Sequence, residues 1–338
     1  MKTLVKYIII MLAATAATGC THKDLGEEAD ENMRVRVVFD WKKSPDATPA
    51  SMSLYLYERS GGKPLRYVFD NRDGGIISVP VGHYDAVAMS SDNTDWAMVR
   101  NTEQKENFEI YTDEVDGMNV DDLNEGLETY TSEDPDHAVV KTPDMLWTAT
   151  DGTFDVNFGV EETLITLYPD EAICHYTIDI YDVENIDYLK DMTLFSTFSG
   201  MAGGIYPGQE SATDNSMTLP LTMKVTDDGS SIHGEFMTFG ECPDIYRSNN
   251  LHLYVFPEEG GPSASPEGMT RGGEEAPDLS KAHAYAFDVS DQAHNASDPK
   301  HVHIVIHGLS LPRPIHDGGG LKPVVDDWLV EYIDIPMK

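Results

Sequence analysis

The stretch MSLYLYERSGGKPLRYVFDNRDGGIISVPVGHYDAVAM, residues 52–89, decides the fold of this chain. β-Branched and aromatic residues, which favour strands, gather in four short segments at 54–57, 67–69, 76–79 and 84–89. Glycine, proline, asparagine and aspartate, which favour turns, lie between these segments. Short strands at this spacing predict an antiparallel β-sandwich.

The same pattern extends in both directions along the chain. Upstream, the alternation of Val35, Val37 and Phe39 with Arg34 and Arg36 predicts a first strand. Downstream, strands are expected at 164–168, 173–181, 217–225, 232–239, 251–256, 283–289 and 301–307. No long segment of the body has the apolar period of an amphipathic helix, so the expected fold class is all-β.

Two sandwich domains are expected, and their boundary lies in the middle of the chain. Asp151-Gly152 lies between strand-like segments at 145–149 and 154–158 and predicts a hairpin turn that closes the first domain. The expected organisation is a signal peptide (1–19), a lipidated linker (20–33), an N-terminal β-sandwich (34–159) and a C-terminal β-sandwich (160–338).

A weak internal repeat is consistent with two like domains. Residues 54–57 (LYLY) resemble 253–256 (LYVF), and residues 67–70 (YVFD) resemble 285–288 (YAFD), in the same order. The offsets differ, which a loop insertion after residue 256 would explain. Chance resemblance between β-rich segments is the alternative.

The first twenty residues have the pattern of a cleaved export signal. Lys2 and Lys6 precede a short apolar run, and small residues lead to Cys20. Because the run is shorter than the ~20 apolar residues that a membrane-spanning helix needs, we interpret it as a signal and not as an anchor. The Ala-Thr-Gly-Cys junction resembles a bacterial lipobox, in which the thiol of Cys20 would be acylated and hold the protein on a membrane.

The charge of the chain excludes one class of partner. The 338 residues include 23 basic and 59 acidic side chains, a formal net charge of −36. Loss of Lys2 and Lys6 with the signal leaves 21 basic residues against 59 acidic ones, or −38. A field of this sign repels phosphate backbones, so no nucleic-acid partner is expected.

Two cysteines remain once Cys20 is acylated, and an oxidising envelope would permit Cys174 and Cys242 to form a disulfide. Whether they pair depends on their distance, which the sequence does not give. Two separate thiols are the alternative.

No catalytic, cofactor or metal site is expected. His301, His303 and His307 would share one face of a strand, but no nearby motif supplies the further ligand of a zinc site. The sequence also lacks the usual nucleophile, metalloprotease and phosphate-binding motifs. We therefore do not expect an enzyme, and half-exposed histidines on a sheet face are the simpler interpretation.

Several segments together resemble a known family. They are Phe39-Asp40-Trp41 after the first strand, Met52-x-Leu54-x-Leu56-Tyr57, the segment 74–84 (GGIISVPVGHY) and Ser91-Asp92-Asn93, following the lipobox. In this layout the chain resembles lipoproteins akin to the FimB-type fimbrial anchors of the fimbrillin clan. The resemblance implies two transthyretin-like sandwiches, a lipid anchor in the outer membrane that faces the cell exterior, and fimbrial subunits as partners bound by β-strand addition.

The segment 324–335 is the strand that we would first test as a partner strand. Trp328, Val330 and Tyr332 alternate on one face, and Val324 begins the segment. A last strand folded into its own domain is the alternative for this segment. For the whole chain, the alternative function is a stand-alone surface lipoprotein that binds host protein or glycan.

Overall fold

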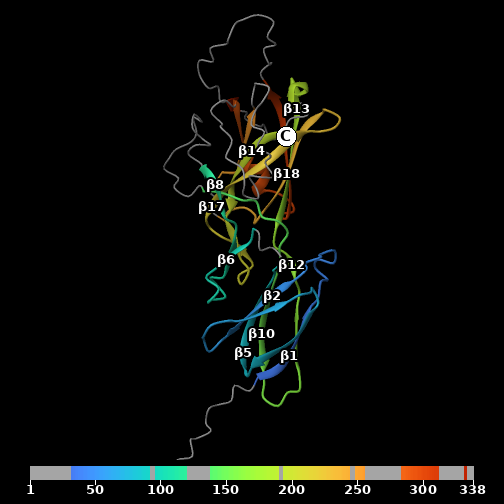
Figure 1. Cartoon of the computed structure of the whole chain (residues 1–338). Helices are drawn as coiled ribbons and strands as arrows, with labels where there is room; N and C mark the ends of the chain where they lie inside the picture. Colours follow the sequence, from blue (N-terminus) through green and yellow to red (C-terminus); the bar gives the residue numbers. More distant parts are fainter. Residues whose placement is uncertain are drawn as a thin grey trace, which may run out of the picture.

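The computed structural model describes residues 32–91, 96–119, 138–189, 193–243, 248–255, 283–311 and 331–332. Two β-rich lobes lie end to end along one axis, lobe 1 from the first half of the chain and lobe 2 mainly from the second (Figure 1). The expected all-β sandwich class is confirmed. Within the described ranges, no helix combines the length and the apolar character that crossing a membrane requires.

Lobe 1 is a sandwich of two sheets. Its strands are β1 (Asn32–Phe39), β2 (Met52–Glu58), β3 (Leu65–Phe69), β4 (Gly74–Pro80), β5 (Gly82–Ser90), β10 (Trp147–Val156), β11 (Thr163–Leu167) and β12 (Asp170–Glu171). The smaller sheet has the order β11-β1-β4, and the larger has the order β12-β10-β5-β2-β3.

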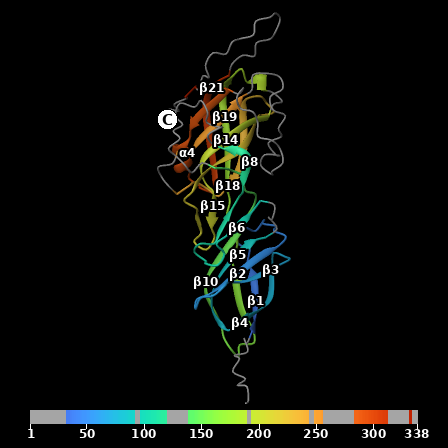
Figure 2. The same cartoon turned by 60° about the vertical axis from the view of Figure 1, so that its left-hand side comes forward.

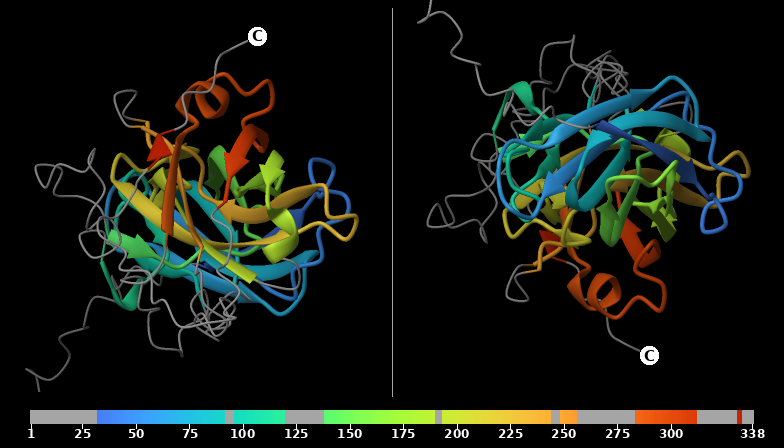
Figure 3. Two further views of the ribbon diagram at one scale, coloured as in Figure 1. Left: turned by 90° about the horizontal axis from the view of Figure 1, so that it is seen from above. Right: turned by 90° about the horizontal axis from the view of Figure 1, so that it is seen from below.

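Lobe 2 is built around a ten-stranded sheet whose main path is β21-β13-β18-β17-β14-β19-β20-β22. The bounds are β13 (Cys174–Glu184), β14 (Thr193–Ala202), β17 (Ser216–Val225), β18 (Ser231–Thr238), β19 (Asn250–Val255), β20 (His283–Asp288), β21 (His301–Ser310) and β22 (Glu331–Tyr332). A 3-10 turn, η1 (Ile186–Leu189), follows β13, and the helix α4 (Ser290–His294) lies on the outside of the lobe (Figures 2 and 3).

The two lobes share one seven-stranded topology. In chain order the main strands are β1, β2, β3, β4, β5, β10 and β11 in lobe 1, and β13, β14, β17, β18, β19, β20 and β21 in lobe 2. In both lobes the seventh, first and fourth strands are neighbours, and the sixth, fifth, second and third follow one another. The first and seventh strands are parallel in both, and the other neighbours are antiparallel. The chain therefore contains a structural duplication.

The duplication is not the one that the sequence repeat suggested. Residues 54–57 lie in β2, whose counterpart is β14, whereas residues 253–255 lie in β19, the counterpart of β5. The similarity of the two motifs reflects a shared burial pattern, because both lie in central strands with Leu54 and Leu253 fully buried. The alignment of the repeat predicted from the sequence is therefore wrong.

Two further expectations at the junction need correction. The strand at 163–167 is β11, which pairs in parallel with β1, so it belongs to lobe 1 and not to the second run of strands. Asp151-Gly152 makes no hairpin, because β10 continues through it along β5. The pairing passes from Asp151↔Ala86 to Phe154↔Tyr84, so one extra residue forms a β-bulge there. A boundary at 159/160 would cut lobe 1 between its sixth and seventh strands.

A small third sheet lies at the waist between the lobes (Figure 1). It consists of β6 (Met98–Arg100), β7 (Glu109–Tyr111), β15 (Gly204–Tyr206) and β16 (Ser211–Ala212), in the order β16-β15-β7-β6. Two more strands, β8 (Glu114–Asn119) and β9 (Ala138–Val140), extend the sheet of lobe 2. Residues between the fifth and sixth strands of lobe 1 thus pair with lobe 2.

Burial of both faces of β2 ties the lobes together. Leu54 and Leu56 face the core of lobe 1, whereas Tyr55 and Tyr57 contribute to a separate apolar cluster with Phe108, the residue before β7. That cluster also takes residues from β5, β15 and the end of β18. The alternation of leucine and tyrosine in β2 therefore serves two cores, and the waist is a packed interface.

Candidate assembly site at the sheet edges

An unpaired sheet edge presents free main-chain N–H and C=O groups, to which a strand of another chain can add. The candidate sites for strand addition are therefore the edges of the sheets in the two lobes. The structure leaves them in different states.

A side chain blocks the edge at β21. Gln292 of α4 donates through Nε2 to the carbonyl oxygen of Val305 at 2.9 Å, and the Val305 N–H donates to Gln292 Oε1, also at 2.9 Å. The primary amide thus takes the place of a neighbouring strand at the centre of β21. No sequence signal marked Gln292, because its position depends on how α4 docks on the sheet.

The edge at β20 is covered by β22 of the same chain. The pairing is parallel, with Tyr285 opposite Glu331 and Ala286 opposite Tyr332. Of the residues predicted for a partner strand, Tyr332 has its main chain here, while Val324, Trp328 and Val330 lie outside the described residues. At Glu331 and Tyr332 the chain therefore pairs with its own lobe, which agrees with the alternative of a last strand folded into its own domain.

The edge at β17, the third strand of lobe 2, carries two additions. Its end pairs with β18 through Met223↔Gly234, Lys224↔His233 and Val225↔Ile232. Further along, β9 adds in parallel, with Thr218 opposite Val139, and β8 pairs with β9 in turn. A third-strand edge in this topology can therefore accept an added parallel strand.

The edge at β3, the third strand of lobe 1, is different. Among the described strands β3 pairs only with β2. The pairing of β3 with β4, which would correspond to that of β17 with β18, is missing from the described ladders. A side chain spans the gap between β3 and β4 instead, because the Tyr67 hydroxyl donates to the Ser78 carbonyl oxygen at 2.7 Å. Figure 2 shows β3 at the side of lobe 1. Within the described residues, the main chain of β3 is thus open on the side away from β2.

Basic side chains flank this open edge. Residues 59–69 contain Arg59, Lys63 and Arg66 and no acidic residue, in a chain whose acidic residues outnumber basic ones 59 to 23. All three side chains are exposed. Arg66 lies over the Tyr55 ring, 5.6 Å from its centroid, and beside it the side chain of Val68 is 54% exposed. The composition of 59–69 is a signal of this basic edge that is visible in the sequence.

The exposed histidines of β21 (His301, His303 and His307) lie on the outer face of lobe 2, paired with carboxylates. His303 Nε2 lies 2.7 Å from Asp179 Oδ2, and His307 Nδ1 lies 2.8 Å from Asp182 Oδ2. His301 contacts Asp298 at 3.1 Å. In the part of the chain that the structure describes, no three potential ligands are placed to hold a metal ion.

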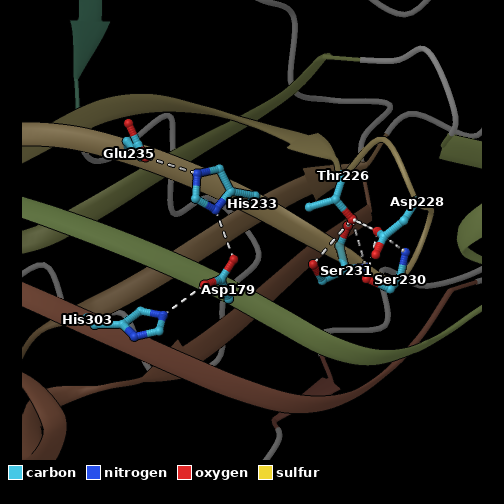
Figure 4. A network of polar contacts seen from close by, with 8 residues as sticks. All are labelled: Asp179, Thr226, Asp228, Ser230, Ser231, His233, Glu235 and His303. Atoms are coloured by element: carbon cyan, nitrogen blue, oxygen red, sulfur yellow. Dashed lines mark hydrogen bonds and ion pairs between the residues drawn. The ribbon is translucent and has the colours of Figure 1, made fainter.

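Asp179 lies at the centre of a small polar network (Figure 4). His233 of β18 approaches its other oxygen at 2.8 Å, so two histidines from strands on either side share one carboxylate. Burial opposes ionisation of Asp179, but the hydrogen bonds from His233 and His303 outweigh it and lower its pKa. The hydrogen bond to Asp179 raises the pKa of His233. The network therefore joins three strands by charge-assisted hydrogen bonds.

The other polar group in Figure 4 is the turn between β17 and β18. Asp228 accepts hydrogen bonds from Ser230 Oγ at 2.7 Å and Thr226 Oγ1 at 2.8 Å. These bonds lower the pKa of Asp228. Its carboxylate is occupied in closing the turn.

Both described cysteines are free thiols. Cys242 is buried and its Sγ lies 3.4 Å from the Asp214 carbonyl oxygen. Burial raises the pKa of the Cys174 thiol to about 11, so it is protonated at neutral pH. The disulfide that the sequence left open is not formed in the structure, and Cys20 lies outside the described residues.

A polar hollow of about 370 Å³ opens at the waist. It is lined by Asn101, Glu103, Gln104, Asn107 and Tyr206. Carboxamide, carboxylate and phenol groups around an open hollow offer hydrogen bonds and an aromatic face to a polar ligand.

The duplicated sandwich is a fold that solved structures share. A solved "putative adhesin" from Bacteroides ovatus is similar over 88% of this chain and 99% of its own, with a TM-score of 0.55 and 16% identity. The fimbrial anchor protein Mfa2 from Porphyromonas gingivalis matches over 81% of this chain and 90% of its own, with a TM-score of 0.46 and 12% identity. The first of these likenesses supports the fold.

The chain belongs to the family described as Domain of unknown function (DUF5119), which matches residues 19–222. It is also similar to "Putative fimbrium anchoring subunit Fim4B" of Bacteroides ovatus, with 25% identity over 116 residues. That match spans 34% of each chain, about a third of the relative's own length. The resemblance to fimbrial anchor proteins that the sequence suggested is confirmed.

Proposed function

We propose that this protein is a surface-exposed outer-membrane lipoprotein that acts as a fimbrial anchor or accessory subunit and binds partner subunits by β-strand addition. The observation that carries the proposal is the similarity to the B. ovatus anchoring subunit, 25% identity over 116 residues. The sandwich of lobe 1 adds support, because the edge of β3 offers main-chain groups to a partner strand.

The position of the first strand fits a lipid at Cys20. Asn32, where β1 begins, follows Cys20 by twelve positions, which span at most about 40 Å when extended. β1 lies in the half of lobe 1 that is remote from lobe 2 (Figure 1). An acylated Cys20 would therefore hold lobe 1 near the membrane and leave lobe 2 outermost.

The anchor is tested by substitution of the lipidated cysteine. Cys20→Ala should release the protein from the outer membrane into the soluble fraction, since one thiol would carry the acyl chains. Cys174→Ala is the matched control and should stay in the membrane pellet after a carbonate wash. Retention of Cys20→Ala in the pellet contradicts the lipid anchor.

The fimbrial role is tested by what accompanies the native protein. Affinity purification from solubilised outer membranes should recover fimbrial subunits with the wild-type chain, and deletion of the gene should release fimbriae into the medium. The fimbrial role is contradicted if the purified protein brings no fimbrial subunit with it and fimbriae stay attached to cells that lack the gene.

The second candidate function, a stand-alone surface lipoprotein that binds glycan or host protein, rests on the hollow at the waist. Its carboxamides and Tyr206 match the chemistry that binds a sugar by hydrogen bonds and ring stacking. This function would be favoured over the anchor by two results together. The wild type should bind glycans on an array and the variants Tyr206→Ala and Asn107→Ala should not, and deletion of the gene should leave fimbriae attached to the cells.

A further inference from the structure

We infer that the open edge of β3 in lobe 1 is a docking site for an extended acidic strand of another protein chain, which adds parallel to β3. The inference deepens the proposed function, because it names the edge and the chemistry of the partner strand, and it rests on that function only for the identity of the partner.

The duplication supplies the first argument. β3 and β17 are the third strands of their lobes, at the same end of the order sixth-fifth-second-third. On β17 this edge accepts β9 in parallel, with Thr218 opposite Val139. The molecule therefore displays strand addition at this position of the fold, and β3 has the same position with no described strand on the side away from β2.

The other described edges of the larger sheets supply the second argument. Gln292 occupies the edge at β21, β22 covers β20, and β12 covers β10 through Trp147↔Glu171 and Thr148↔Asp170. Each of these edges is satisfied within the chain. β3 is five residues long, enough for a short ladder.

Charge supplies the third argument and selects the occupant. Lys63 and Arg66 make the surroundings of β3 basic in an otherwise acidic protein, whereas the Arg59 guanidinium is paired with Asp85 of β5. Two copies of this edge would face each other with like charges, which disfavours a homodimer through β3. A strand with acidic side chains is attracted instead, and Val68, 54% exposed, offers an apolar contact for one of its side chains.

The test uses the purified chain and a synthetic peptide with the sequence of residues 324–335 (VVDDWLVEYIDI), an acidic segment with alternating apolar positions. Binding is measured by fluorescence anisotropy. The matched control peptide has lysine at each acidic position. We expect the acidic peptide to bind the wild-type chain, with affinity that falls as salt rises, and the lysine peptide to bind at least about tenfold more weakly.

Two proline variants locate the site on the main chain. Successive N–H groups of a strand point to opposite sides, so of Tyr67→Pro and Val68→Pro one removes an outward N–H and the other breaks a bond to β2. Thermal unfolding identifies the variant that keeps native stability. That variant should bind the acidic peptide at least about tenfold more weakly than the wild type.

Charge reversal gives an independent readout. The double variant Lys63→Glu with Arg66→Glu should bind the acidic peptide more weakly than the wild type and the lysine peptide more tightly. Lys224→Glu, an exposed position on β17, is the control and should change neither. The inference is overturned if the wild type does not bind the acidic peptide. It is also overturned if the stable proline variant and the charge-reversed variant both bind this peptide as tightly as the wild type does.

Failure of this inference can be distinguished from failure of the proposed function. If the stable β3 variant still recovers fimbrial subunits from membranes as the wild type does, the docking site is elsewhere and the fimbrial role stands. If the wild type recovers no fimbrial subunit yet binds the acidic peptide through β3, the docking site stands and the fimbrial role fails.

Discussion

Gln292 and Val305 exchange two hydrogen bonds of 2.9 Å, so that a side-chain amide completes the outer strand of lobe 2. Edge strands are prone to pair with other chains, and natural proteins cover or interrupt them. The contact therefore occupies the main-chain groups that a strand would need in order to add at the centre of β21.

Removal of this contact should make lobe 2 self-associate. Gln292→Ala loses both bonds, which should lower the free energy of unfolding by about 1 kcal/mol and free the centre of β21. Sedimentation velocity over a concentration series should show dimers that the wild type does not form. The control is Gln209→Ala, whose side chain donates to the Glu106 carbonyl oxygen away from any sheet edge. This role of Gln292 would be contradicted if Gln209→Ala formed dimers and Gln292→Ala did not.

Gly74 should tolerate no side chain, because two effects coincide there. Its φ is +98°, and an added Cβ would lie 2.3 Å from the Val37 carbonyl oxygen of β1. Gly61 has a similar φ of +101° but open space around it. We expect Gly61→Ala to cost about 1 kcal/mol and Gly74→Ala clearly more, because the β1–β4 ladder must also shift. Chemical denaturation measures both, and equal losses would contradict the steric argument.

Arg100 should stabilise the waist through the buried carboxylate of Glu109. The guanidinium makes two hydrogen bonds to it, at 2.7 and 2.6 Å, and the Glu109 side chain is 5% exposed. Arg100→Ala leaves that charge uncompensated and should cost about 2 kcal/mol of unfolding free energy. The exposed pair Arg59–Asp85, at 3.3 Å, is the comparison, and Arg59→Ala should cost less than about 1 kcal/mol. A smaller loss for Arg100→Ala than for Arg59→Ala would refute this assignment.

The network around Asp179 should make stability depend on pH. The lowered pKa of Asp179 means that its contribution is complete above its ordinary value of 3.8 and is lost as pH falls through the folded-state pKa. The raised pKa of His233 means that its contribution is complete below 6.5 and is lost as pH rises through the folded-state pKa. The difference in unfolding free energy between wild type and Asp179→Asn should therefore be largest between these values. A difference that is constant from pH 4 to about 9 would exclude the network as its source.

The division of the chain into separately folding units should follow the strand pairing. A fragment of residues 34–159 lacks β11, the parallel partner of β1, and leaves Val35 and Val37 without it. We expect this fragment to unfold without cooperativity, whereas residues 32–172, which keep all seven main strands of lobe 1, should give a cooperative transition by circular dichroism. Cooperative unfolding of 34–159 would restore the boundary expected from the sequence.

Local pattern was sufficient for the four strands between residues 52 and 90. In β2, the alternation of Leu54 and Leu56 with Tyr55 and Tyr57 predicts a strand without reference to its neighbours, because successive side chains of a strand point to opposite faces. Turn residues such as Gly74 likewise mark a chain reversal by their own conformational freedom. The all-β class and the family resemblance followed from such short-range signals.

Asp151-Gly152 and β11 illustrate where local pattern stops. An Asp-Gly pair favours both a hairpin turn and a bulge, and the choice depends on whether β5 continues alongside, which is a long-range pairing. The strand β11 has no local feature that tells it to join β1 across more than a hundred residues. Its assignment to lobe 1 is a property of the assembled sandwich.

What the sequence by itself determined is the strand content, the acidic charge, the pattern around Cys20 and the likeness to fimbrial anchor proteins, since each depends on residues adjacent in the chain. Only the tertiary structure decided which edges are open. Gln292 blocks β21, whereas β3 pairs with β2 alone among the described strands, because segments distant in the chain meet or fail to meet there. Hydrogen bonds between strands join main-chain groups that are common to all residues, so side-chain identity alone does not specify the partner.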